Sequence, residues 1–80
     1  MPEKLKAVPP SQVERLSFIE ARLFFLGELR RADVARRFSR ASIQASRDLA
    51  LYKELAPENL VYDYQAKTYL PGENFKLIFS

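Results

Sequence analysis

Apolar residues recur every three or four positions through the first two thirds of the chain and alternate with polar residues in the last third. In the first third, the residues with this spacing are Val13, Leu16, Ile19, Leu23 and Leu26. The spacing is that of one face of an α-helix, so we predict a helix over residues 11–26. Ser11 and Glu14 have the spacing of a capping box at its start, and Gly27 is placed to end it.

Two shorter amphipathic segments follow, and Ser39-Arg40-Ala41 lies between them as a turn. We predict helices over residues 31–38 and 42–55, the second of which stops before Pro57. The residues expected to face inward are Val34, Ala35, Phe38, Ala45, Leu49 and Tyr52, and Ile43 is expected to add to this packing. Two short helices joined by a tight turn are typical of a helix-turn-helix, whose second helix enters the major groove of DNA.

The last third has the period of β-strands. Residues 60–64 and 67–70 are rich in β-branched and aromatic side chains, and Gln65-Ala66 between them has the length of a hairpin connection. We therefore predict a hairpin, or wing, over residues 60–70, with residues 28–30 as a short third strand beside it. The apolar residues 75–79 either pack back onto the domain or precede another domain.

Three helices followed by a hairpin predict an α+β fold, mainly α: a winged helix-turn-helix over residues 11–79, after a flexible lead-in over residues 1–10. Eighty residues make one small domain, and 48% apolar with 29% charged residues is ordinary for a globular protein. No apolar run approaches the roughly 18 residues that span a membrane, so we expect a cytoplasmic protein with no membrane partner.

The composition argues against an enzyme. The chain has no Cys and no His, which removes thiolate ligands, disulfides and the commonest general base. With only Gly27 and Gly72, it has no glycine-rich phosphate loop. Acidic pairs such as Asp48 and Glu54 are expected to be helix-surface acids. We predict no catalytic residue, no metal site and no cofactor.

Positive charge is concentrated in the middle of the sequence. Residues 30–47 hold six Arg against one Asp, a net charge of +5, whereas residues 48–80 have a net charge of −2. Arg pairs bidentately with phosphate and with guanine edges. A charge run by itself is typical of a solvated helix face, but its position in a helix-turn-helix favours a DNA contact.

The candidate readers of DNA bases lie at the start of the third predicted helix: Ser42, Gln44, Ser46 and Arg47. Gln44 has the bidentate chemistry for adenine and Arg47 that for guanine, although Arg47 also suits a phosphate. Asp48 is disfavoured near phosphate, so we expect it to pair with a nearby Arg.

Further cations and the wing supply the remaining candidates. Those for the DNA backbone are Arg31, Arg36, Arg37, Arg40 and Lys53, and each of Arg36, Arg37 and Arg40 could instead be merely solvated. At the wing, Tyr64, Gln65 and Lys67 are candidates for the neighbouring minor groove or its phosphates. Tyr62 and Tyr69 are expected to pack within the hairpin.

The expected function is sequence-specific binding of double-stranded DNA as a transcriptional regulator. One such module reads only a few base pairs, so we predict a homodimer on a palindromic operator. The first helix and the C-terminal segment are the candidate dimer contacts, and Phe18 and Phe25 fit either core packing or a dimer interface. The alternative is a winged helix that docks an acidic protein partner; the small polar side chains of the third helix argue against it.

The sequence also resembles the N-terminal winged-helix domain of WYL-domain transcriptional regulators, nearest to the BrxR/CapW-like group associated with bacterial phage-defence operons. The matching residues are Phe18-Ile19-Glu20, Gly27, Arg30, Asp33, Phe38, the run from Gln44 to Leu49, Tyr52, the run from Asn59 to Asp63, Lys67 and Tyr69. The resemblance spans about residues 11–79 and implies a DNA-binding repressor that usually controls its own gene. It also implies association with the bacterial nucleoid when the protein is bound to DNA.

The chain departs from this family in two places. The family's turn usually contains Gly, an aliphatic residue and Ser, whereas Ser39, Arg40 and Ala41 stand here. We expect Ser39 or Ser42 to replace the lost helix cap, and Arg40 to point outward to a phosphate. No WYL sensor domain follows residue 80, so the chain is either a fragment of a longer regulator or a short protein without a sensor.

Overall fold

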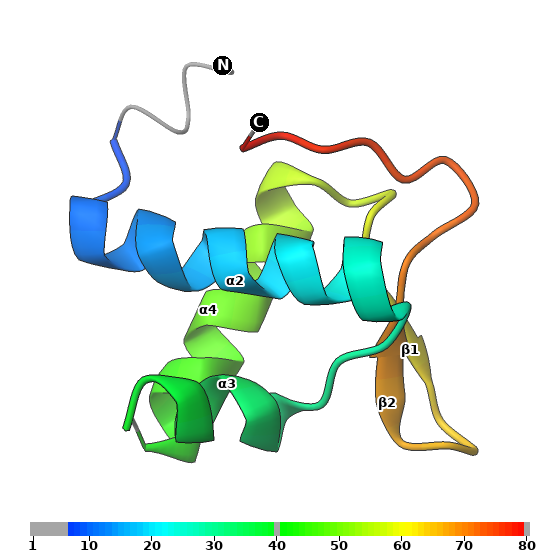
Figure 1. Cartoon of the computed structure of the whole chain (residues 1–80), viewed down its shortest axis with the longest axis horizontal. Coiled ribbons are helices and arrows are strands. Elements are labelled where there is room, and N and C mark those ends of the chain that lie inside the picture. Colours follow the sequence, from blue (N-terminus) through cyan, green and yellow to red (C-terminus); the bar gives the residue numbers. More distant parts are fainter. Residues whose placement is uncertain (1–6, 40, 80) are drawn as a thin grey trace.

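The computed structural model describes residues 7–39 and 41–79. Its elements, in chain order, are α2 (Pro10–Leu26), α3 (Arg31–Arg37), α4 (Ser42–Leu55), β1 (Val61–Asp63) and β2 (Thr68–Leu70). In Figure 1, α2 crosses in front of α4, α3 lies below α2, and the hairpin stands beside the end of α2. The predicted winged helix-turn-helix, α+β and mainly α, is confirmed.

Helix α2 begins earlier than predicted, and its start uses different chemistry. Pro10 is its first residue and Pro9 its N-cap, with no side-chain capping bond. The capping box predicted at Ser11 and Glu14 is wrong, because Ser11 already lies inside the first turn. Proline suits this position since the first helical N–H has no partner within the helix. The predicted lead-in therefore ends at Pro9, and residues 1–6 lie outside the described part.

Two other helix ends can be compared with their predictions. Gly27 ends α2 as predicted, with φ of 74° and its N–H 3.1 Å from the Leu23 carbonyl oxygen. Helix α4 has Ala41 as its N-cap and no side-chain capping bond. Neither Ser39 nor Ser42 therefore replaces the missing cap, contrary to expectation. Arg40, the middle of the predicted turn, lies outside the described residues.

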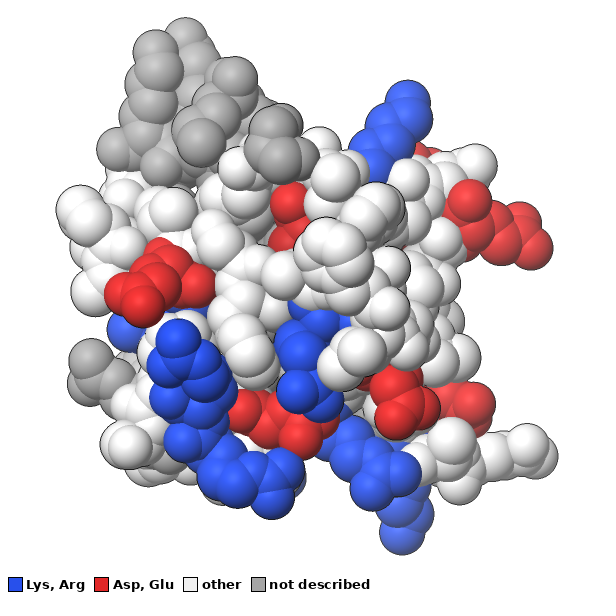
Figure 2. Space-filling view, viewed as in Figure 1, with Lys and Arg blue, Asp and Glu red and all other residues white. Residues whose placement is uncertain are grey.

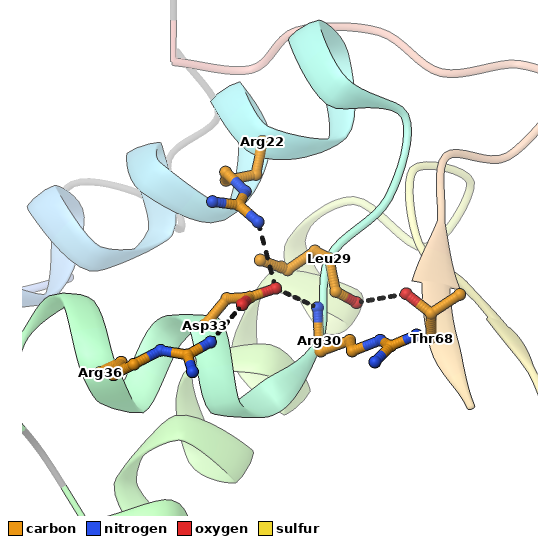
Figure 3. Close-up of polar contacts among 6 residues, drawn as sticks. All are labelled: Arg22, Leu29, Arg30, Asp33, Arg36 and Thr68. Atoms are coloured by element: carbon orange, nitrogen blue, oxygen red, sulfur yellow. Dashed lines mark hydrogen bonds and ion pairs between the residues drawn. The ribbon is translucent and has the colours of Figure 1, made fainter. Parts of the chain in front are cut away.

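Helix α3 is fixed at its first turn by Asp33. The Asp33 carboxylate accepts the Arg30 backbone N–H at 2.9 Å, and it pairs with Arg22 of α2 at 3.2 Å and Arg36 at 2.8 Å. Figure 3 shows the three donors converging on this carboxylate from different elements. Partial burial would raise the pKa of Asp33, but the Arg30 N–H, Arg22 and Arg36 together outweigh it and leave the pKa below its ordinary value.

The core lies where α2, α3 and α4 meet. Its buried apolar residues are Leu16, Ile19, Leu23, Leu29, Val34, Ala45, Leu49, Tyr52, Ala56 and Leu60. Phe18 is partly buried against the core, and its ring packs edge-on against Phe38 with ring centroids 5.4 Å apart. Phe25 is 77% exposed and Ile43 63% exposed, so the expectation that Ile43 adds to the packing is wrong.

The hairpin is antiparallel, with Val61 opposite Leu70 and Asp63 opposite Thr68. Its connection has four residues, 64–67, rather than the predicted two. The Asp63 carboxylate accepts the backbone N–H groups of Gln65 and Ala66 at 3.0 and 3.1 Å, which stabilises the longer loop.

The predicted third strand is reduced to one residue. Leu29 forms an isolated antiparallel bridge with Tyr69, with two backbone hydrogen bonds of 2.9 and 2.7 Å. The Leu29 carbonyl also accepts the Thr68 hydroxyl at 3.1 Å (Figure 3). This bridge attaches the wing to the segment that leads into α3.

The C-terminal segment packs back onto the domain, which was one of the two alternatives. The buried Glu20 carboxylate accepts the N–H groups of Ile78 and Phe79 at 2.8 and 3.0 Å and the Tyr52 hydroxyl at 2.9 Å. The Asn59 side-chain amide donates to the Lys76 carbonyl oxygen at 2.6 Å, and its oxygen accepts the Lys76 backbone N–H at 2.9 Å. Burial raises the pKa of Tyr52 well above its ordinary value, so its hydroxyl remains a donor.

Within residues 7–39 and 41–79, none of the helices is both long enough and apolar enough to cross a membrane.

Candidate nucleic-acid interface

The start of α4, the start of α3 and the wing border one basic hollow. Its volume is about 500 Å³, and it is lined by Arg30, Arg31, Ala32, Ser42, Tyr62, Lys67 and Tyr69. All three cations are exposed. Figure 2 shows Lys and Arg side chains gathered along the lower part of one face, over α3. The hollow thus offers several positive charges beside the N-terminal end of the proposed recognition helix.

The four candidate base readers differ in exposure. Ser42 and Arg47 are exposed, and Gln44 and Ser46 are half-buried. The Ser46 hydroxyl accepts a hydrogen bond from Arg31 at 3.4 Å, which links α3 to α4. Arg47 forms no ion pair within the described part of the chain. Its guanidinium therefore remains available to an outside acceptor.

Gln44, the fourth candidate, is partly committed to the protein itself. It is half-buried, and its side-chain nitrogen donates to the Asp48 carboxylate at 3.2 Å. This bond leaves Gln44 one amide hydrogen and its side-chain carbonyl oxygen for an outside partner.

Asp48 holds α2 and α4 together. It is fully buried, so the expectation of a helix-surface acid is wrong for Asp48, whereas Glu54 is exposed. Its expected Arg partner is confirmed: Arg15 of α2 approaches to 2.7 Å, and Gln12 donates at 3.1 Å. The ion pair lies across the helix crossing, so it sets how α4 is presented rather than touching the outer face.

The candidate residues for the DNA backbone differ in the contacts that they already make within the protein. Arg36 is 75% exposed while it donates to Asp33, and the Arg37 guanidinium lies over the Phe38 ring, 4.9 Å from its centroid. Lys53 donates to the carbonyl groups of Pro57 and Leu60, so it mainly secures the chain after α4. Arg31 reaches α4, as described above, and Arg40 is outside the described residues.

At the wing, the three predicted contact residues are all exposed. Tyr64 is 82% exposed, and Gln65 and Lys67 follow it in the loop. Tyr62 packs against Tyr69 with ring centroids 4.8 Å apart, so these two tyrosines pack within the hairpin as expected. Burial and the neighbouring Tyr62 raise the pKa of Tyr69. A second hollow, of about 360 Å³, separates the wing from α4.

Sequence reasoning missed two residues of this face. Arg30 was expected in a short strand, and it lines the hollow beside Lys67. Ile43 was expected in the packing, and it is exposed at the second position of α4. The available signal for Ile43 was helical spacing, since it shares a face with Arg47 and Ala50 rather than with Ala45 and Leu49.

Helices α2, α3 and α4, the attached wing, and the cations beside the polar start of α4 define a winged helix-turn-helix domain of the DNA-binding class. The family model described as the BrxR transcriptional regulator winged helix-turn-helix domain matches residues 11–80. The chain belongs to this family, which is one of transcriptional regulators, and the resemblance inferred from the sequence is confirmed.

Three relatives that are similar to this chain carry the same name. The DNA-binding transcriptional repressor CapW of Stenotrophomonas maltophilia is 45% identical over 67 residues, which cover 84% of this chain and 22% of that protein. The proteins of that name from Pseudomonas aeruginosa and Escherichia coli strain KTE188 are 40% and 37% identical over 68 residues, covering 85% of this chain and 23% of each relative. The chain therefore spans less than a quarter of the length of these relatives.

Proposed function

We propose that this chain is the sequence-specific DNA-binding domain of a transcriptional repressor, with the N-terminal end of α4 in the major groove. The observation that carries the proposal is the basic hollow, where Arg30, Arg31 and Lys67 lie beside the start of α4. The outer face of α4 is small or polar at Ser42, Ser46 and Ala50, so bulk does not keep the helix out of a groove. The family and the described role of the CapW relatives support the same function.

Within this proposal, the side chains at the start of α4 read the bases. Arg47 is exposed and takes the bidentate contact to guanine, while Ser42 and Ser46 supply hydrogen bonds to base edges. Gln44 contributes its remaining donor and acceptor to an adenine, in an orientation held by Asp48.

The cations around α3 and the wing hold the DNA backbone. Arg31, Arg36 and Arg37 approach phosphates beside the major groove, and Arg40 and Lys53 complete the proposed set. Tyr64, Gln65 and Lys67 extend the contact into the neighbouring minor groove. Phosphate contacts of this kind set register and affinity, whereas base contacts set sequence preference.

The active species is proposed to be a homodimer on a palindromic operator, because one module of this size contacts only a few base pairs. A WYL sensor domain is proposed for the part of the regulator that corresponds to the remaining length of the CapW relatives. We propose that the operator lies just upstream of the protein's own gene and that the protein acts in the cytoplasm.

A gel-shift titration tests this function directly. The wild-type chain is expected to bind the duplex from upstream of its gene more tightly than a scrambled duplex of equal length and composition, at 150 mM salt. Arg47→Ala is expected to weaken the specific complex about 5- to 150-fold for each half-site bound, because a good bidentate base contact discriminates by about 1–3 kcal/mol.

Lys76→Ala is the matched control, since Lys76 is exposed in the C-terminal segment, away from the start of α4 (Figure 1). It removes the same charge and should bind like the wild type. Equal affinity of the wild type for the specific and scrambled duplexes would contradict sequence-specific recognition. Failure to shift any duplex, with salt-sensitive binding to an acidic protein, would favour the docking alternative.

A further inference from the structure

Ile43 occupies an unusual position for a large apolar side chain. It is the second residue of α4 and is 63% exposed. Among the residues of α4, all of which the structure describes, Ile43 is the only exposed large apolar one. Other exposed large apolar residues gather elsewhere, as at Phe24, Phe25 and Leu77 around the end of α2. Ile43 therefore stands alone at the start of the recognition helix rather than within an apolar patch.

The surroundings of Ile43 indicate what it can contact. Ser42 precedes it, and Arg47 lies one turn further along the same face. In the major groove, base edges present hydrogen-bond donors and acceptors at every pair, and the one apolar group among them is the C5-methyl of thymine. An isoleucine offers no hydrogen bond, so thymine is the base that it can distinguish.

We propose that Ile43 recognises the C5-methyl group of a thymine in each operator half-site. This inference rests on the proposed function and adds a specificity-determining residue to it. Ile43 and Arg47 are four residues apart, about 6 Å along the helix axis, and base pairs are about 3.4 Å apart. The thymine therefore lies within about two base pairs of the base that Arg47 contacts.

The test removes the methyl group from the DNA and the side chain from the protein. Each thymine of the bound duplex is replaced in turn by deoxyuridine, which lacks only the methyl group. The wild type is expected to lose about fourfold in affinity at one position per half-site, since burying one methyl group contributes about 0.8 kcal/mol. Ile43→Ala is expected to bind the unmodified duplex more weakly and to lose this sensitivity at that position.

Leu26→Ala is the matched control, because Leu26 is an aliphatic side chain of α2 with 61% exposure. It should keep the deoxyuridine profile of the wild type. Equal urea midpoints of the three proteins establish that the folds are intact. Tight wild-type binding with a flat deoxyuridine profile, or an Ile43→Ala profile identical to that of the wild type, overturns the assignment of Ile43 alone. Absence of any specific wild-type complex overturns the proposed function and this inference with it.

Discussion

Asp33 shows how much of this domain depends on one side chain. Its carboxylate accepts the first backbone N–H before α3 and pairs with Arg22 on the neighbouring helix. Because the Arg22 pair crosses from α2 to α3, Asp33 secures both the start of α3 and its position against α2. The depressed pKa of Asp33 expresses the same stabilisation, since the charged form is favoured in the folded state.

Replacing Asp33→Asn is expected to lower the free energy of unfolding at pH 7 by about 1–2 kcal/mol, because a capping acceptor and two ion pairs are weakened. The folded pKa of Asp33 lies below the unfolded value of about 3.9. The stabilisation by the charge is therefore complete above about pH 5 and is lost as the pH falls through the folded pKa.

Urea unfolding of the wild type and Asp33→Asn from pH 2 to pH 7 measures this difference. The two proteins should converge in stability at the acid end. Glu73→Gln, at an exposed position, is the control and should follow the wild type. A difference that stayed constant over the whole range would mean that the charge of Asp33 contributes nothing.

At the scale of elements, the two glycines are required for different reasons. Gly27 ends α2 with a positive φ, and a Cβ added there would meet no atom within 4 Å. A Cβ added at Gly72, by contrast, would overlap the backbone carbonyl oxygen of Glu58. Gly27 is thus required by its backbone conformation alone. Gly72 is required because the backbone that follows β2 lies close to the backbone of Glu58, which follows α4.

We expect Gly27→Ala to cost about 1–2 kcal/mol of stability, the usual penalty of the left-handed conformation. Gly72→Ala should cost more than this, toward the upper end of the about 1–3 kcal/mol typical of overpacking, because the atom it meets is backbone. Urea denaturation measures both. Gly27→Asn is the control and should lose less than Gly27→Ala, since Asn tolerates this conformation. Wild-type stability of Gly72→Ala would show that the approach is not tight.

For the molecule as a whole, the segregation of charge would provide a long-range attraction to DNA under the proposed function. The chain carries a formal net charge of +3, yet residues 30–47 alone carry +5 and residues 48–80 carry −2. Figure 2 shows the cations gathered over α3 on the viewed face. A polyanion would therefore meet this domain in a preferred orientation before any base is contacted.

Arg37→Ala is expected to weaken binding to all DNA sequences by about the same factor, because a phosphate contact carries no direct sequence information. The slope of the logarithm of affinity against the logarithm of salt concentration should become less steep by about 0.9 for each lost contact, or about 1.8 for the two protomers of the proposed dimer. Titrations at 50–200 mM salt on specific and scrambled duplexes measure both effects. An unchanged slope would mean that Arg37 is only solvated, and Lys76→Ala should leave the slope as it is.

The sequence by itself determined the elements and much of their order. Helical spacing gave α4 its bounds of 42–55, and Gly27 and the β-rich runs located the end of α2 and the wing. These features are local, because periodicity and backbone preference act within a few residues along the chain. The excess of Arg over residues 30–47 is likewise a property of the sequence, so the basic character of the candidate site could be predicted without the structure.

Only the tertiary structure decided how individual side chains are used. Asp48 is buried because Arg15, 33 residues away in sequence, meets it where α2 crosses α4. Gln44 turns toward that same carboxylate, while Ile43 beside it is left exposed. The angle at which α2 crosses α4 sets which face of α4 is covered. That angle cannot be predicted from the periodicity of α4 alone. The roles of neighbouring residues at the start of α4 therefore depend on a contact with α2, which is distant in the sequence.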